Sequence, residues 1–147
     1  MNFELQHGAE RPLLVRDIMV REVATISAFA TLRDALGELR RRKVKSLVVE
    51  KAHPHDAFGI LTYTTILRTI VAEEGDIDLI NVYDVVAKPV ITVGPELELK
   101  YVARLMVSQG IRRIVVVDGD GLAGIISMND IVDAIVALIG DPDPTAS

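Results

Sequence analysis

Short aliphatic runs alternate with amphipathic stretches along the chain, and this pattern predicts strands and helices in a regular order. Residues 47–49 and 114–117 are uninterrupted aliphatic runs of the kind that forms buried strands. In residues 32–39 the apolar positions recur at spacings of three and four, which predicts one buried stripe along a helix, and residues 99–106 repeat this spacing. The remaining predicted strands lie at 23–26, 58–62, 90–93 and 122–126, and the remaining helices at 63–72 and 128–139.

The chain contains the same unit twice. With a shift of 67 positions, Asp17 aligns with Asp84 and Thr25 with Thr92, and the apolar positions of the first helix coincide as well. After the central strand the shift falls to 65, because the first hairpin loop is two residues longer. A match over roughly 100 positions with one small insertion indicates an internal duplication. We therefore expect a flexible leader at 1–12, repeats at 13–72 and 80–140, a linker at 73–79, and a disordered tail at 141–147.

Each copy has about 60 residues in the predicted order strand, helix, strand, strand, helix. A domain of that length buries too little apolar surface to be secure alone, so we expect the two copies to pack together. Their apolar strands need cover on both faces, from helices or from a second sheet. The sequence therefore predicts an α+β protein built from two β-α-β-β-α repeats.

Composition narrows the function classes. Half of the 147 residues are hydrophobic but only 4% are aromatic and none is Trp, which predicts an aliphatic core. The absence of cysteine excludes disulfides, thiolate metal sites and cysteine nucleophiles. The formal charge of −5 argues against general binding to nucleic acids, because that binding depends on neutralising phosphates. Neither a signal peptide nor a membrane-spanning run is visible, so we expect a soluble cytoplasmic protein with no membrane partner.

The strongest candidate for chemistry is the stretch 124–131, where a predicted strand turns into a helix. Ser127 is a good N-cap, and Asp130 falls in the first helical turn, where the helix dipole favours a carboxylate. Such a corner can hold a ribose, because Asp130 can accept hydrogen bonds from both hydroxyls while Ser127 adds a third polar contact. The same two residues also fit a capping box that binds no ligand.

Together these motifs resemble the CBS domain, the cystathionine-β-synthase-type module that occurs as tandem pairs. The resemblance covers about residues 15–139 and is carried by 17–19, 59–62, 110–118 and 124–131. It implies a compact pseudo-twofold pair with two clefts between the copies. Such clefts commonly bind AMP, ADP, ATP or S-adenosylmethionine, and no other cofactor is required. The family is regulatory rather than catalytic, and its pairs often form a disc-like homodimer.

Site residues follow from the resemblance, position by position. Asp130 would be the ribose-binding carboxylate, with Ser127 and Asn129 beside it. Arg113, together with Arg112, would face the phosphates, and arginine forks do match phosphate oxygens. The remaining residues, which would line the adenine slot mostly from the first copy, are Ile125, Leu14, Met19, Val44, Lys45 and Ser46.

The first copy departs from this pattern. Thr65 stands where the second copy has Asp130, and Lys45-Ser46 replaces Arg112-Arg113. A hydroxyl lacks the charge-assisted pairing of a carboxylate, and that difference alone is worth up to about 30-fold in affinity. The pseudo-symmetric cleft is therefore expected to be weaker. Its predicted residues are Thr62, Thr65, Val86 and Ile111.

The other motifs are weaker evidence of function. The loop at 53–56 contains two histidines and an aspartate, but a proline between the histidines favours a solvated turn over a metal site. The basic run at 40–43 closes a helix, where cations complement the dipole. No catalytic triad or phosphate loop is present, so an enzyme is disfavoured. We expect a stand-alone sensor that reports an adenosyl ligand to a partner protein; the alternative is a constitutive dimerisation disc with vestigial clefts.

Overall fold

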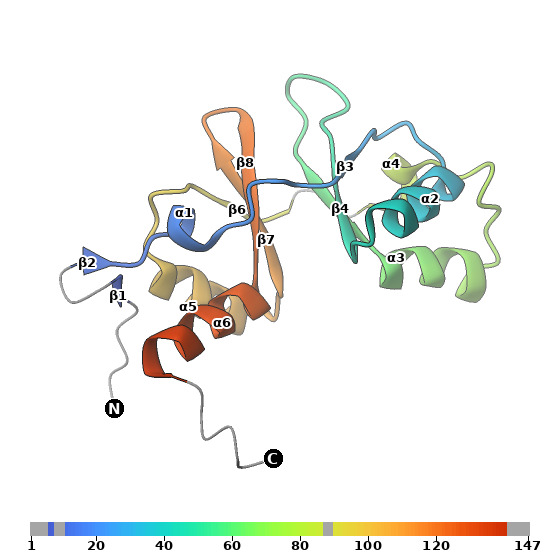
Figure 1. Ribbon diagram of the computed structural model, residues 1–147. Coiled ribbons are helices and arrows are strands. Elements are labelled where there is room, and N and C mark those ends of the chain that lie inside the picture. The colour runs from blue at the N-terminus through green and yellow to red at the C-terminus, as the bar shows by residue number, and fades with distance from the viewer. Residues whose placement is uncertain (1–5, 8–10, 87–89, 141–147) are drawn as a thin grey trace, which may run out of the picture. The chain divides into compact units, whose positions relative to one another are not determined.

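The computed structural model describes residues 6–7, 11–86 and 90–140. The chain divides into two compact units, one formed by Glu22–Val90 and the other by Met1–Arg21 together with Ile91–Ser147. We call them the Thr65 unit and the Asp130 unit after the residues at their equivalent corners. Each unit combines a three-stranded sheet with helices, as the predicted α+β class requires (Figure 1).

The Thr65 unit is built around a mixed sheet in the order β3-β4-β5, in which β3 runs parallel and β5 antiparallel to β4. The helix expected at 63–72 is α3 followed by a π-helical turn, η1. The elements in chain order are β3 (Thr25–Ile26), α2 (Leu32–Arg42), β4 (Ser46–Val49), β5 (Gly59–Thr62), α3 (Tyr63–Leu67), η1 (Arg68–Ala72) and α4 (Val82–Val85).

The Asp130 unit repeats this arrangement with the sheet order β6-β7-β8. Its described leader residues form a short antiparallel pair, β1 with β2, where the sequence predicts no regular structure. The tail at 141–147 lies outside the described residues. The elements are β1 (Gln6–His7), β2 (Arg11–Pro12), α1 (Val15–Ile18), β6 (Thr92–Val93), α5 (Leu99–Gln109), β7 (Arg113–Asp118), β8 (Gly121–Ser127) and α6 (Met128–Ile139).

The leading segment of each sequence repeat packs with the other repeat. Leu13, Val15 and Met19 open the first repeat, yet they belong to the core of the Asp130 unit. Val15 N–H donates to the Leu97 carbonyl at 2.8 Å, which anchors this segment. Val82 in turn belongs to the core of the Thr65 unit. The repeats of the sequence and the compact units of the structure therefore do not coincide.

Both cores are aliphatic, and their helices begin where side chains can cap them. Leu32 and Leu39 of α2 are fully buried, so the predicted stripe faces the sheet. Thr31 Oγ1 accepts from Asp34 N–H at 3.2 Å, and the Asp34 carboxylate accepts from Thr31 N–H at 3.1 Å. This reciprocal capping box fixes the start of the helix that the sequence predicts.

Candidate ligand-binding sites

The corner between β8 and α6 is a capping box with an unused acceptor. Ser127 Oγ accepts from Asp130 N–H at 3.1 Å, and Asp130 Oδ2 accepts from Ser127 N–H at 2.8 Å. Within the described part of the chain, the Asp130 carboxylate has no other partner. Since a carboxylate offers about four acceptor positions, Asp130 can cap the helix and still accept bonds from a ligand.

Capping alone does not distinguish Asp130. The carboxylates of three other residues also accept a backbone N–H from three residues upstream, at 2.9–3.3 Å; these are Asp17, Asp34 and Asp84. Asp34 is exposed, whereas Asp130 is half-buried. Evidence for a ligand site at Asp130 must therefore come from the residues around it.

Two arginines lie beside this corner. Arg113 is the register partner of Ser127 across β7 and β8, and the Arg112 carbonyl accepts from Met128 N–H at 2.8 Å. Neither guanidinium has a hydrogen-bond or ion-pair partner among the described residues. Arg113 is half-buried and Arg112 exposed. The corner thus combines a carboxylate that retains acceptor capacity with two cations that have no partner among the described residues, which suits a ligand that has both hydroxyl and anionic groups.

The segment before β3 pairs antiparallel with β8 at Ile125, next to the corner. Val20 N–H donates to the Ile125 carbonyl at 2.8 Å, and Ile125 N–H donates back to Val20 at 3.0 Å. A Cβ on Gly124 would lie only 2.7 Å from the Val20 carbonyl and 3.0 Å from the Met19 sulfur. Glycine therefore allows the backbone and Met19 to approach β8 this closely.

The predicted site residues divide between the two units. Residues that share the Asp130 unit are Leu14, Met19, Ile111, Arg112, Arg113, Ile125, Ser127, Asn129 and Asp130. Residues in the Thr65 unit are Val44, Lys45, Ser46, Thr62, Thr65 and Val86. Each of the two sites predicted from the sequence thus includes residues of both units.

The equivalent corner of the Thr65 unit has the same backbone arrangement with weaker chemistry. Ser46 is the register partner of Thr62, as Arg113 is of Ser127. Thr62 Oγ1 accepts from Thr65 N–H at 3.5 Å, the outer limit of a hydrogen bond. Thr65 brings no carboxylate, and Lys45 is an exposed single cation.

A hollow of about 480 Å³ in the Thr65 unit contains residues that the sequence did not single out. It is lined by Glu22, Val23, Ala24, Arg42 and Val44, of which only Val44 is among the predicted site residues. Parallel pairing explains the grouping, because Val48 N–H donates to the Ala24 carbonyl and so aligns the approaches to β3 and β4. The sequence held no signal for this grouping, because Glu22 and Arg42 are about 20 residues apart in the chain.

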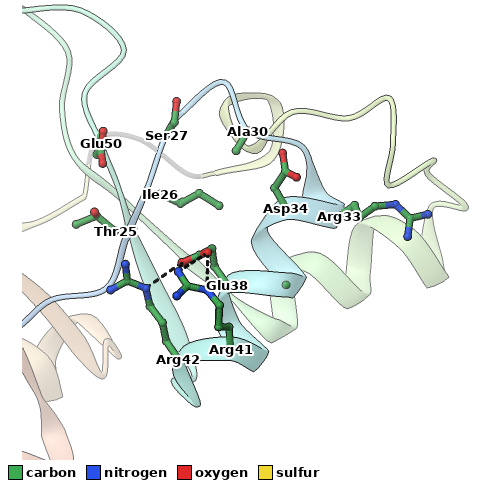
Figure 2. Close-up of a pocket in the computed structure, with 11 residues that line it drawn as sticks. Thr25, Ile26, Ser27, Ala30, Arg33, Asp34, Glu38, Arg41, Arg42 and Glu50 are labelled. Atoms are coloured by element: carbon green, nitrogen blue, oxygen red, sulfur yellow. Dashed lines mark hydrogen bonds and ion pairs between the residues drawn. The ribbon is translucent and has the colours of Figure 1, made fainter.

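A larger groove, about 730 Å³, follows α2 beside β3 (Figure 2). At its lower end Glu38 binds two arginines: Arg41 Nη2 donates at 2.7 Å and Arg42 Nε at 2.9 Å. The hydrogen bonds from Arg41, followed by that from Arg42, lower the pKa of the Glu38 carboxyl from its usual value. Arg42 lines both the groove and the hollow.

The loop at 53–56, a weak candidate for a metal site in the sequence, is a turn in the structure. Within the described residues, no group of three or more His, Cys, Asp or Glu side chains could hold a metal ion. In the loop at 53–56, Asp56 accepts from Ala52 N–H at 2.8 Å and its own N–H donates to the His53 carbonyl, as in a closed turn. Over the same described residues, no helix has the length and apolarity needed to cross a membrane.

Two duplicated α+β units, each with a polar corner between its last strand and helix, define a tandem module. The family model of the CBS domain matches the chain twice, at residues 15–72 and 82–137. The chain belongs to the CBS-domain family, which confirms the resemblance seen in the sequence. A CBS pair is a regulatory module, and that class applies here.

The curated proteins that this chain resembles differ in kind. The chain is 33% identical over 125 residues to an uncharacterised protein of Methanopyrus kandleri, covering 83% of this chain and 62% of that protein. It is 32% identical to the mitochondrial CBS domain-containing protein CBSX3 of Arabidopsis thaliana (72% and 53% covered) and to arabinose 5-phosphate isomerase KdsD of Salmonella typhimurium (90% and 42%). The chain spans about half the length of these curated relatives.

Solved structures share the fold. A hexameric CBS-CP12 protein from bloom-forming cyanobacteria is 37% identical with a TM-score of 0.77, covering 88% of this chain and 76% of that one. The CBS domain pair of protein MJ0100, solved with 5′-methylthioadenosine and S-adenosylmethionine, is 21% identical with a TM-score of 0.73, covering 86% and 98%. At that identity the second likeness concerns the fold alone.

Proposed function

We propose that this chain binds an adenosine-containing ligand, either an adenine nucleotide or S-adenosylmethionine, at the Asp130 corner and signals its presence to a partner protein. The observation that carries this proposal is the Asp130 carboxylate, which keeps acceptor capacity beyond its capping bond and lies near Arg113, a cation with no partner among the described residues. The presence of adenosyl ligands in the CBS pair of MJ0100 supports the ligand class.

Each side chain has a distinct role in this proposal. The ribose hydroxyls donate to Asp130, with Ser127 and Asn129 as further polar contacts. Arg113 and Arg112 bind phosphate or another anionic end group, since guanidinium forks match such oxygens. The base packs on the apolar residues of the same unit, Leu14, Met19 and Ile125. A contribution of residues 44–46 to this site stays a prediction.

The regulatory output requires two states of the protein. A ligand shifts the balance between them only if it binds one state more tightly than the other. We infer that the bound state presents a different surface to the partner protein, and no step of this scheme changes the ligand chemically. The ligand therefore acts as a signal rather than as a substrate.

Calorimetric titration of the chain with AMP, ADP, ATP and S-adenosylmethionine tests the proposal. We expect at least one of them to bind, with one dominant site per chain, because Asp130 is matched by the neutral Thr65 in the other unit. Two equal sites would contradict the assignment of the stronger site to Asp130. No measurable binding of any of the four would remove the adenosyl proposal and leave the constitutive dimerisation module.

We further expect a homodimer or a higher oligomer. Tyr63, Leu67 and Val71 recur at spacings of four along α3 and η1 and are 40%, 53% and 67% exposed. Such an exposed apolar stripe is typical of an interaction surface, and the related CBS-CP12 protein is a hexamer. Light scattering that gives the monomer mass of 16.1 kDa at micromolar concentration would contradict this expectation.

A further inference from the structure

We propose that an exposed apolar surface of the Thr65 unit, formed by Phe29, Leu79 and Tyr83, binds a basic segment of a partner protein that places an apolar side chain against it. These three side chains are 67%, 78% and 46% exposed, and we call them the Phe29 surface. The inference rests on the proposed function, because it names the surface that the signalled partner protein contacts and the chemistry of that partner.

The Phe29 surface lies where the segment before α2 pairs with the segment that leads into α4 (Figure 1). Thr31 and Asn81 form an antiparallel bridge between the two segments. Tyr83 N–H donates at 2.9 Å to the carbonyl of the residue before Phe29. Leu79 lies two residues before Asn81 on the second segment. Backbone pairing therefore brings residues about 50 positions apart in the chain to one place.

The backbone holds Phe29 at the surface. Ser27 Oγ accepts from Phe29 N–H at 3.1 Å, and on the other side the Ala30 carbonyl accepts from Val82 N–H at 2.8 Å. Ala28, the residue before Phe29, is buried in the core of the unit. An aromatic side chain presented by a fixed backbone makes a good anchor for binding, because little conformational freedom remains to be lost when a partner covers it.

The Asp130 unit carries an ion pair at the equivalent positions. At the shift of 67 residues, Phe29 and Tyr83 correspond to Glu96 and Arg16. Arg16 N–H donates to the Pro95 carbonyl at 2.9 Å, the bond that Tyr83 forms in the other unit, and Arg16 Nη1 donates to both carboxylate oxygens of Glu96 at 2.8 Å. The same backbone thus accepts a solvated ion pair, so the fold does not require two aromatic residues here.

Acidic side chains border the Phe29 surface. The segments 27–31 and 76–84 contain three charged residues, all acidic and all exposed: Asp76, Asp78 and Asp84. Asp78 forms an ion pair with Arg33, whereas Asp76 and Asp84 have no cationic partner within the described part of the chain. The border is therefore net negative. Complementary charge favours a partner segment with lysine or arginine around its apolar side chain.

The test measures the binding of a short fluorescein-labelled peptide, in which lysine and leucine alternate, to the full chain by fluorescence anisotropy. The variant is Phe29→Glu combined with Tyr83→Arg, which introduces the residue pair of the Asp130 unit and leaves the net charge unchanged. We expect it to fold like the wild type and to bind the peptide at least about 5-fold more weakly, as when an important apolar anchor is lost from an interface. Peptides with glutamate for lysine, or serine for leucine, should lose as much with the wild type.

Tyr101→Ser is the matched control. Tyr101 is 44% exposed, close to the value for Tyr83, but Lys100 and Arg104 lie over its ring with their charged groups 5.2 and 5.6 Å from its centroid. This variant should bind the lysine–leucine peptide as the wild type does. An equal loss in Tyr101→Ser would mean that the peptide binds exposed aromatic residues in general, and would overturn the proposal. Equal binding of the glutamate peptide and the lysine peptide would also overturn it.

Two other occupants of the Phe29 surface give different results. If light scattering shows that the double variant is a monomer while the wild type is an oligomer, the surface binds a second copy of this chain. If the double variant lowers the midpoint of urea unfolding, the rest of the chain covers the surface. Either result overturns the assignment to a partner protein.

Calorimetry with AMP and S-adenosylmethionine separates this inference from the proposed function. We expect the double variant to bind these ligands as the wild type does, because neither substitution touches the Asp130 corner. If the wild-type chain binds a ligand but not the lysine–leucine peptide, only the Phe29 surface is overturned. If it binds the peptide but no adenosyl ligand, the proposed function is overturned and the surface remains a binding site without that signal.

Discussion

Replacing Asp130 with alanine is expected to lower the affinity for AMP and for adenosine by similar factors. Both ligands present the same ribose, and the substitution removes the carboxylate oxygen that is left free by the capping bond. A charge-assisted hydrogen bond contributes about 1.5–3 kcal/mol, so the loss should be about 10- to 150-fold. Parallel calorimetric titrations of the two ligands measure it.

Asp130→Ala also removes a helix cap, so a control must separate capping from binding. Asp34 forms the same reciprocal box with Thr31 at the start of α2 and is far from the corner in sequence. Asp34→Ala should cost a similar amount of stability, about 1 kcal/mol, and leave AMP binding unchanged. If both variants weaken AMP to the same extent, Asp130 acts only through the fold.

Arg113→Ala completes the comparison by separating phosphate from ribose. We expect it to weaken AMP by about 10- to 150-fold, because the phosphate loses its cation, and to change adenosine little. Arg113 has no protein partner among the described residues, so its removal leaves no orphaned carboxylate. Unchanged AMP binding would return Arg113 to the role of a surface cation.

Replacing Gly124 with alanine is expected to destabilise the protein by about 1–3 kcal/mol, the usual cost of forcing an extra carbon into a packed site. The new Cβ would lie 2.7 Å from the Val20 carbonyl and 3.0 Å from the Met19 sulfur. The carbonyl belongs to the backbone, which is itself held by two hydrogen bonds to Ile125, so it cannot simply turn away. Denaturant unfolding followed by circular dichroism measures the change.

Gly37→Ala is the same kind of substitution, but its expected effect on stability is the opposite. Gly37 lies inside α2, and a Cβ there would meet nothing within 4 Å. Alanine is favoured over glycine in a helix by about 1 kcal/mol, so this variant should be more stable than the wild type. If Gly124→Ala is as harmless as Gly37→Ala, the close approach of Val20 to β8 does not limit stability.

Gly124 also links stability to the proposed site. The segment it admits carries Leu14 and Met19, which are proposed to contact the base, into the unit that carries Asp130. Val20 pairs with Ile125, two residues before Ser127, so these hydrogen bonds connect the segment of Leu14 and Met19 to the strand that leads to Ser127. We expect Gly124→Ala to weaken AMP and adenosine equally, beyond any effect of Gly37→Ala.

The sequence by itself determined the features that depend on neighbouring residues. The stripe of Leu32 and Leu39 predicted α2, and Thr31 with Asp34 predicted its first turn, because helix faces and caps are local. The duplication predicted two similar copies, and the motifs within them resembled the CBS-domain family that the family model matches. It also placed Ser127 and Asp130 together, since three residues of one helix turn fix their distance.

Only the tertiary structure decided which segments of the chain belong to which of the two units. Periodicity shows which side of residues 13–20 is apolar, but not which core that side enters, and both cores could accept it equally well by pattern alone. The structure assigns the segment to the Asp130 unit through Val15 and Val20. Glu22 and Arg42 likewise share one hollow only because parallel strands bring together two approaches that are about 20 residues apart in the chain.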